Sequence, residues 1–202
     1  MSKISLKELN KQLKESEIGL DTDAIELTPY WGVYHFHEWD HGYETIYGFN
    51  GSRREFYADM REMLEFLIAY FNTMCIKEIV IAPFHRYNQF DQRYYRSIKM
   101  PGTDIFDEIR QFLKVHGVRK GERTGIGIPV ESNAHILEMI IEGSFRAVSQ
   151  FCLFSYEHKI LIEANHHFNL IFRTHEFEKA RRIACDLLPS YPNLRYFDKY
   201  TT

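Results

Sequence analysis

Residues 144–173, SFRAVSQFCLFSYEHKILIEANHHFNLIFR, decide the fold of this chain. They contain three runs rich in β-branched and aromatic residues, a composition typical of strands. The runs are 145–156, 159–163 and 168–173. Short polar sequences, Glu157-His158 and Asn165-His166, separate them and are typical of tight turns. Strands joined by tight turns pair antiparallel, so this stretch predicts a three-stranded antiparallel meander.

Further strands are predicted towards the N-terminus. Tyr30 to Glu38 and Tyr43 to Phe49 are both rich in aromatic residues, and Trp39-Asp40-His41-Gly42 between them is typical of a turn. Residues 30–49 therefore predict a β-hairpin. Glu78 to Pro83, EIVIAP, is a short and dense apolar run, which predicts a central strand covered on both faces.

Helical periodicity and capping signals predict four helices around these strands. Ser52 and Glu55 form a capping box before the longest helix, and Ser132 and Thr174 are expected to cap two others. We expect glycines to end the two middle helices, at Gly117 and Gly143. The four predicted helices are about 53–74, 104–116, 133–142 and 175–188.

These elements predict a two-layer α+β fold. The expected sheet is mostly antiparallel, built from the N-terminal hairpin and the C-terminal three-stranded meander, and covered by about four helices. The length of 202 residues fits one domain, 1–202. A capping box at Ser5 and Glu8 opens a short amphipathic helix, which we interpret as an N-terminal arm within residues 1–20. We expect a basic, glycine-containing loop at 119–129 and a C-terminal tail at 190–202.

The composition is that of a soluble cytosolic protein. The formal net charge of -3 gives no general attraction to nucleic acid or to an anionic membrane. Apolar runs are too short to cross a bilayer, and the N-terminus lacks the apolar segment of a signal peptide. We interpret the three widely spaced cysteines, Cys75, Cys152 and Cys185, as reduced core thiols.

The first candidate site is His35-Phe36-His37-Glu38 with His41 beyond it. Alternate side chains of a strand share a face, so His35 and His37 can reach one divalent metal ion. With His41 as third ligand and Glu38 as base, this would be a hydrolase or oxidase site. Residues 37–41 also satisfy H-E-x-x-H literally, but that motif works on a helix and the surrounding residues predict strands. The alternative is a set of structural or surface histidines, with no cofactor.

The second candidate site is the segment 84–99, FHRYNQFDQRYYRSIK. Interleaved arginine and tyrosine side chains can bind phosphates, stack on flat rings and contact acidic protein surfaces. If the segment is helical, its rings form an inward stripe and its arginines are an ordinary solvated face. The predicted contact residues are Arg86, Tyr87, Arg93, Tyr94 and Arg96.

The sequence leaves the question of enzymatic activity open. Because no catalytic signature is established, we expect a small binding or regulatory protein that contacts a protein partner through 84–99. One alternative is a metal-dependent hydrolase or oxidase at His35, His37 and His41. Another is a nucleotide or nucleic-acid binder through 84–99. The aromatic surface also indicates a homodimer, and no membrane partner is expected.

Overall fold

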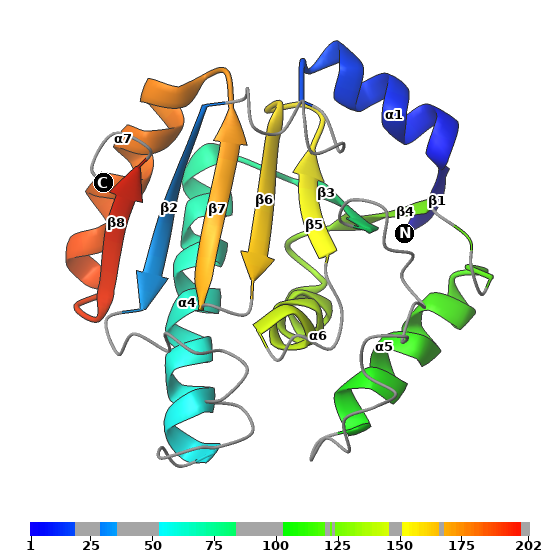
Figure 1. Ribbon diagram of the computed structural model, residues 1–202, viewed down its shortest axis with the longest axis horizontal. Coiled ribbons are helices and arrows are strands. Elements are labelled where there is room, and N and C mark those ends of the chain that lie inside the picture. The colour runs from blue at the N-terminus through cyan, green and yellow to red at the C-terminus, as the bar shows by residue number, and fades with distance from the viewer. Residues whose placement is uncertain are drawn as a thin grey trace.

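The computed structural model describes residues 1–18, 29–35, 53–83, 103–119, 122, 124–145, 151–165 and 168–198. Its centre is an eight-stranded sheet with the strand order β1-β4-β3-β5-β6-β7-β2-β8 (Figure 1). Every neighbouring pair of these strands is antiparallel, which confirms the predicted fold class. The strands are β1 (Ser2–Ser5), β2 (Tyr30–His35), β3 (Glu78–Pro83), β4 (Thr124–Pro129), β5 (Phe151–Ser155), β6 (Ile160–Asn165), β7 (Asn169–Thr174) and β8 (Leu194–Asp198).

Four helices share one face of the sheet, as the sequence predicts. They are α4 (Arg53–Met74), α5 (Thr103–Val115), α6 (Ala134–Phe145) and α7 (Phe177–Leu187). One apolar cluster joins residues of all four helices to Trp31, Val33 and Phe172 of the sheet. In Figure 1, α4 accordingly lies behind the strands, and α6 lies below the ends of β5 and β6. Burial of this cluster is the main driving force that holds helices and sheet together.

A fifth helix, α1 (Leu6–Glu15), lies on the opposite face of the sheet. Its predicted cap is confirmed, because the Glu8 amide donates to Ser5 Oγ at 3.2 Å. Leu9 and Leu13 pack with Val80 and Ala82 of β3 in a second apolar cluster, so α1 is part of the packed structure rather than an outlying arm. The remaining apolar residues of β3 face the main cluster, which confirms a strand covered on both faces.

The predicted meander is confirmed as β5, β6 and β7, with a later start. Phe145 is the last residue of α6 rather than the first of a strand. Gly143 lies buried inside α6 and does not end it, whereas Gly117 follows α5 with a φ of 72°, the left-handed conformation that ends helices. The cap of α6 is one residue later than predicted, because Leu137 N donates to the carbonyl of Asn133.

The predicted hairpin is wrong for β2. Both edges of this strand are occupied, by β7 on one side and β8 on the other, and residues 43–49 lie outside the described residues. The strand β8 comes from the predicted C-terminal tail, and β4 comes from the predicted loop 119–129. These two segments are strands because they pair with strands that are distant in the sequence. Such pairing cannot be recognised from the local sequence.

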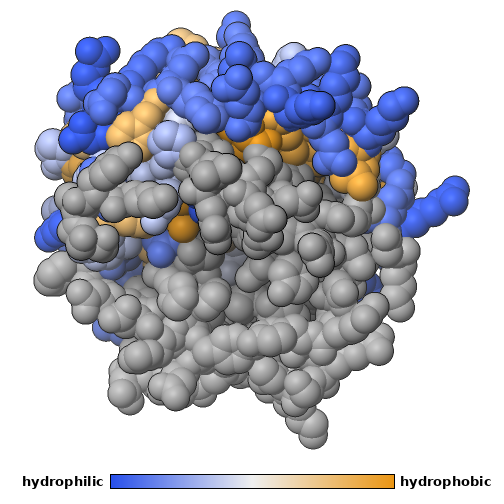
Figure 2. Space-filling view, turned by 45° about the horizontal axis from the view of Figure 1, so that its top comes forward, coloured by the Kyte–Doolittle hydropathy of each residue, from blue (hydrophilic) through white to orange (hydrophobic). Residues whose placement is uncertain are grey.

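The described surface is mostly hydrophilic. Its exposed large hydrophobic residues are Met1, Val115 and Tyr156, and they are far apart in the sequence. Figure 2 shows apolar residues in small, separate patches among hydrophilic ones. Within the described ranges, no helix combines the length and the hydropathy needed to cross a bilayer.

Candidate functional site

Both segments that the sequence singles out are attached to the same end of the sheet. β2 ends at His35, just before the predicted metal ligands, and β3 ends at Pro83, just before 84–99. The register places these two ends along the same edge of the sheet. Pro83 pairs with the first residue of β5, and the end of β2 lies beside the first residue of β7. Four strand spacings separate β2 from β3, which is about 19 Å.

Of the predicted site residues, His35 is the one that belongs to the described part of the chain. The structure therefore tests the surroundings of His35 and leaves the other assignments as predictions. The residues outside the described ranges are His37, Glu38, His41, Arg86, Tyr87, Arg93, Tyr94 and Arg96.

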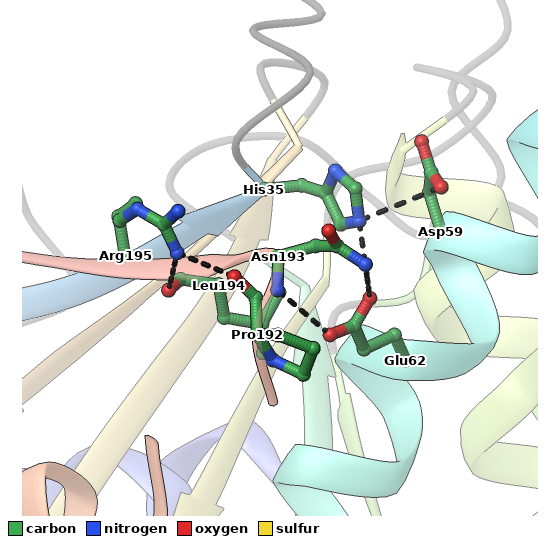
Figure 3. Close-up of polar contacts among 7 residues, drawn as sticks. All are labelled: His35, Asp59, Glu62, Pro192, Asn193, Leu194 and Arg195. Carbon is green, nitrogen blue, oxygen red and sulfur yellow. Dashed lines mark hydrogen bonds and ion pairs between the residues drawn. The ribbon is translucent and has the colours of Figure 1, made fainter. Parts of the chain in front are cut away.

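His35 faces two carboxylates of α4. Its side chain is buried, with 1% of its surface exposed. The ring nitrogen Nε2 lies 3.3 Å from Glu62 Oε2 and 3.5 Å from Asp59 Oδ1 (Figure 3). A carboxylate at this distance holds a proton on Nε2 and orients the imidazole. His35 thus links the end of β2 to the side of α4.

Glu62 extends this link to β8. Its carboxylate accepts hydrogen bonds from the Asn193 backbone amide at 3.2 Å and from Asn193 Nδ2 at 3.0 Å (Figure 3). Asn193 immediately precedes β8, in a turn closed by a hydrogen bond from Leu194 N to the Tyr191 carbonyl. The side chain of Arg195 also donates to carbonyl oxygens of this turn. One glutamate therefore fixes the start of β8 against α4.

Aromatic rings enclose the other side of His35. The Phe168 ring lies edge-on to the imidazole and also contacts Phe56 and Phe145. Phe168 has a φ of 58°, which is rare for a bulky residue, and its carbonyl accepts a hydrogen bond from His35 N at 3.3 Å. Ring packing holds this backbone conformation in place. The imidazole is therefore held between two carboxylates on one side and the Phe168 ring on the other.

The described network can orient an imidazole, which is one requirement of a general base. Histidine and carboxylates are also metal ligands. However, no group of three or more His, Cys, Asp or Glu side chains within the described ranges is arranged to hold a metal ion. With 1% of its surface exposed, His35 acts here as a structural tie between elements.

Other ionisable groups are also held by their surroundings. Glu163 and Arg173 form a buried ion pair, with Glu163 Oε1 2.5 Å from Arg173 Nε. Burial raises the pKa of the Glu163 carboxyl even though Arg173 lowers it. Burial likewise raises the pKa of the Cys152 thiol, which suits an inert core cysteine. Cys75 and Cys185 are exposed, so the prediction of core thiols holds for Cys152 alone.

Sequence reasoning missed the partners of His35. Asp59 is buried between Phe56 and Met63 on the apolar side of α4, and a carboxylate inside an apolar stripe is a signal that sequence analysis can detect. Glu62 follows one helical turn later on the same side. Asn193, which binds Glu62 and forms no hydrogen bond with His35, belonged to the predicted tail, and no local pattern marks it.

Comparisons with known proteins provide no relative from which a residue's role can be transferred. No family model matches the chain, no curated protein matches its sequence and no solved structure matches it.

Proposed function

We propose that this chain is a binding or regulatory protein that contacts a protein partner through residues 84–99. The observation that carries the proposal is the burial of His35 and its contact with α4. This residue of the predicted metal site is buried and serves to join β2, α4 and β8. That role favours a structural histidine over a catalytic one, which supports binding over catalysis.

The attachment of 84–99 to the fold also supports a binding role. The segment follows directly after β3, which is paired on both sides by β4 and β5 and in which Ile79 to Ala82 are buried. Segments that leave a rigid sheet are common positions for binding residues. Arginine and tyrosine are enriched in protein interfaces. Nucleotide or nucleic-acid binding through this segment stays an alternative prediction.

Paired substitutions test the proposal. The variant Arg93→Glu with Tyr94→Ala reverses one positive charge and removes one ring from 84–99. The matched control, Arg182→Glu with Tyr156→Ala, makes the same changes at two exposed positions elsewhere. Partners would be cross-linked in the native cell, captured and quantified by mass spectrometry.

We expect a protein that both the native chain and the control capture to be lost by about tenfold or more from the 84–99 variant. If every captured protein is retained at native levels by that variant, the proposed contact surface is wrong.

The second candidate is a metal-dependent hydrolase or oxidase at His35, His37 and His41 with Glu38 as base. Asp59 and Glu62 lie beside His35, and carboxylates and imidazoles are common ligands of divalent metals, but such a site needs His37 and His41 as well, because the described side chains alone form no metal-binding group. Elemental analysis of protein purified without an affinity tag tests this. Stoichiometric zinc or iron that is lost in His37→Ala, but kept in the exposed control His135→Ala, would support the enzyme. Native protein without metal would exclude it.

A further inference from the structure

Residues 1–18 form β1 at one edge of the sheet and α1 on the face opposite the other described helices. We name this segment the cover. Leu9, Leu13 and Ile18 of the cover pack against five buried residues of β3, β5 and β6. We name these five residues the covered face: Val80, Ala82, Cys152, Phe154 and Leu161. The sheet separates this apolar cluster from the main cluster, so the cover contributes little to the main core.

The position of β1 allows the cover to leave without disturbing the rest of the sheet. β1 is an end strand and pairs with β4 alone. The buried Thr124 hydroxyl adds a hydrogen bond to the Ile4 carbonyl. If β1 detaches, β4 keeps its pairing with β3, and no other strand loses a neighbour. In Figure 1, β1 and α1 (blue) lie together on the right of the sheet, away from α4 and α7.

The side-chain bonds that tie the cover to the rest of the chain are mostly exposed. The Tyr156 hydroxyl donates to Glu15 Oε2 at 2.6 Å, and both side chains are exposed. Lys3 Nζ lies 2.6 Å from Glu122 Oε1, with about a third of each side chain accessible. Water competes for such bonds, so each contributes little to stability. The cover is therefore held mainly by its three buried apolar side chains and by the pairing of β1.

The packing of α1 shows what the covered face recognises. Leu9 and Leu13 are one helical turn apart, and both are buried against the covered face. Glu15 follows two residues later and meets the Tyr156 hydroxyl. The rest of α1 is polar and mostly exposed. An amphipathic helix whose apolar anchors lie four residues apart is a common recognition element for an apolar groove or face.

We propose that residues 1–18 are a displaceable, autoinhibitory cover on a helix-binding face. When the cover opens, the covered face binds an amphipathic helix of a protein partner, which has two leucines four residues apart and an acidic residue two positions later. At rest the cover makes the same contacts, so the apparent affinity for the partner is reduced to the fraction of molecules in which the face is open. This site is separate from 84–99.

Hydrogen exchange compares the opening of the cover with the opening of the whole fold. We expect the amides of α1 to exchange at least about 100-fold faster than the buried amides of α4. Ile140→Val removes one methyl group from the main cluster, so it should speed exchange in α4 about fivefold. It should leave exchange in α1 unchanged, because α1 exchanges through an open form in which the main cluster is intact.

Fluorescence anisotropy with a labelled synthetic peptide of residues 1–18 tests the recognition. Leu13→Ala removes one anchor of the cover from the full chain, and we expect it to bind the peptide at least about tenfold more tightly than the native chain does. In this variant the α4 amides should stay protected. Ile140→Val is the matched control and should bind the peptide as the native chain does. A peptide with Leu9→Ser and Leu13→Ser should not bind.

Three results would overturn the inference. One is an equal acceleration of exchange in α1 and α4 by Ile140→Val, since the cover would then open only with the whole fold. Another is exchange in α4 as fast as in α1 in the Leu13→Ala variant, which would have the same meaning. The third is a peptide affinity that is the same for Leu13→Ala and the native chain, or that does not depend on the two leucines of the peptide.

Discussion

Replacing Glu62 with alanine tests whether the network around His35 holds the fold together. The Glu62 carboxylate accepts two hydrogen bonds from Asn193, at 3.2 and 3.0 Å, and lies 3.3 Å from His35 Nε2. Alanine removes all three contacts. The imidazole of His35 loses the nearer of its two carboxylate partners, and Asn193 loses the acceptor that fixes the start of β8.

The expected cost follows from these contacts. A hydrogen bond to a charged group contributes about 1.5–3 kcal/mol, and a buried donor left without an acceptor costs about 1–3 kcal/mol. The Glu62 side chain is 17% exposed, so water replaces part of what is lost. The three contacts share one carboxylate and do not add fully. We therefore expect Glu62→Ala to lower the free energy of unfolding by about 2–4 kcal/mol.

Urea unfolding of two variants makes the test specific. Glu65→Ala is the matched control, because Glu65 lies three residues later on the same helix with an exposed side chain. We expect this control to stay within about 0.5 kcal/mol of the native chain. Glu62→Ala should lower the urea midpoint without changing the slope of the transition. Equal free energies of unfolding for the two variants, within about 0.5 kcal/mol, would refute the structural role of the network.

Three further predictions concern buried groups. Tyr70→Phe should leave the free energy of unfolding unchanged or raise it by up to about 2 kcal/mol in urea unfolding, because the buried Tyr70 hydroxyl has no hydrogen-bond partner among the described residues. A loss above about 1 kcal/mol would contradict this. A thiol reagent should label Cys75 and Cys185 in the native protein and Cys152 only after unfolding, because Cys152 is fully buried. Since burial raises the pKa of Glu163, ionisation is less favourable in the folded chain than in the unfolded chain, so its contribution to stability falls as the pH rises through its folded pKa. Urea unfolding of Glu163→Gln should then show stability rising relative to the native chain between about pH 4 and pH 7, and the opposite slope would count against the shift.

Local signals were sufficient where an element is specified by its own residues. The helix expected at about 53–74 is Arg53–Met74 in the structure, because its apolar periodicity extends over 22 residues. The meander was predictable for the same reason, since tight turns force adjacent runs to pair with each other. Gly117 ends α5 as expected because its φ of 72° suits glycine.

Strands that depend on distant partners could not be predicted locally. β4 has the sequence TGIGIP, and its glycines lower its strand propensity. The structure explains Gly125, because a Cβ there would lie 2.6 Å from Val80 Cγ1 of the neighbouring strand. β8 follows Pro192 near the C-terminus and pairs with β2, over 150 residues earlier. Its alternation of inward and outward residues is too short to distinguish a strand from a tail.

The candidate site was predictable only in part, for a related reason. A strand with H-x-H indicates histidines on one face, but the carboxylate partners of His35 come from α4, and one of them, Glu62, is in turn held by Asn193 in the turn before β8. Asp59 is recognisable as a carboxylate in an apolar stripe. What it faces depends on how α4 packs on the sheet, and that is a property of the whole fold.

The two faces of β2 differ in how much they contribute to the core. On the helix side, Trp31 and Val33 are fully buried and His35 ends the strand against α4, so substitutions there act on stability. On the other face, Tyr30 and Tyr34 are half-buried and belong to no apolar cluster, so they contribute less to the core. Strand residues alternate with a period of two, so the residues that hold the sheet to its helices are separated from the half-buried residues of the other face, and substitutions at Tyr30 or Tyr34 should cost less stability than substitutions at Trp31 or Val33.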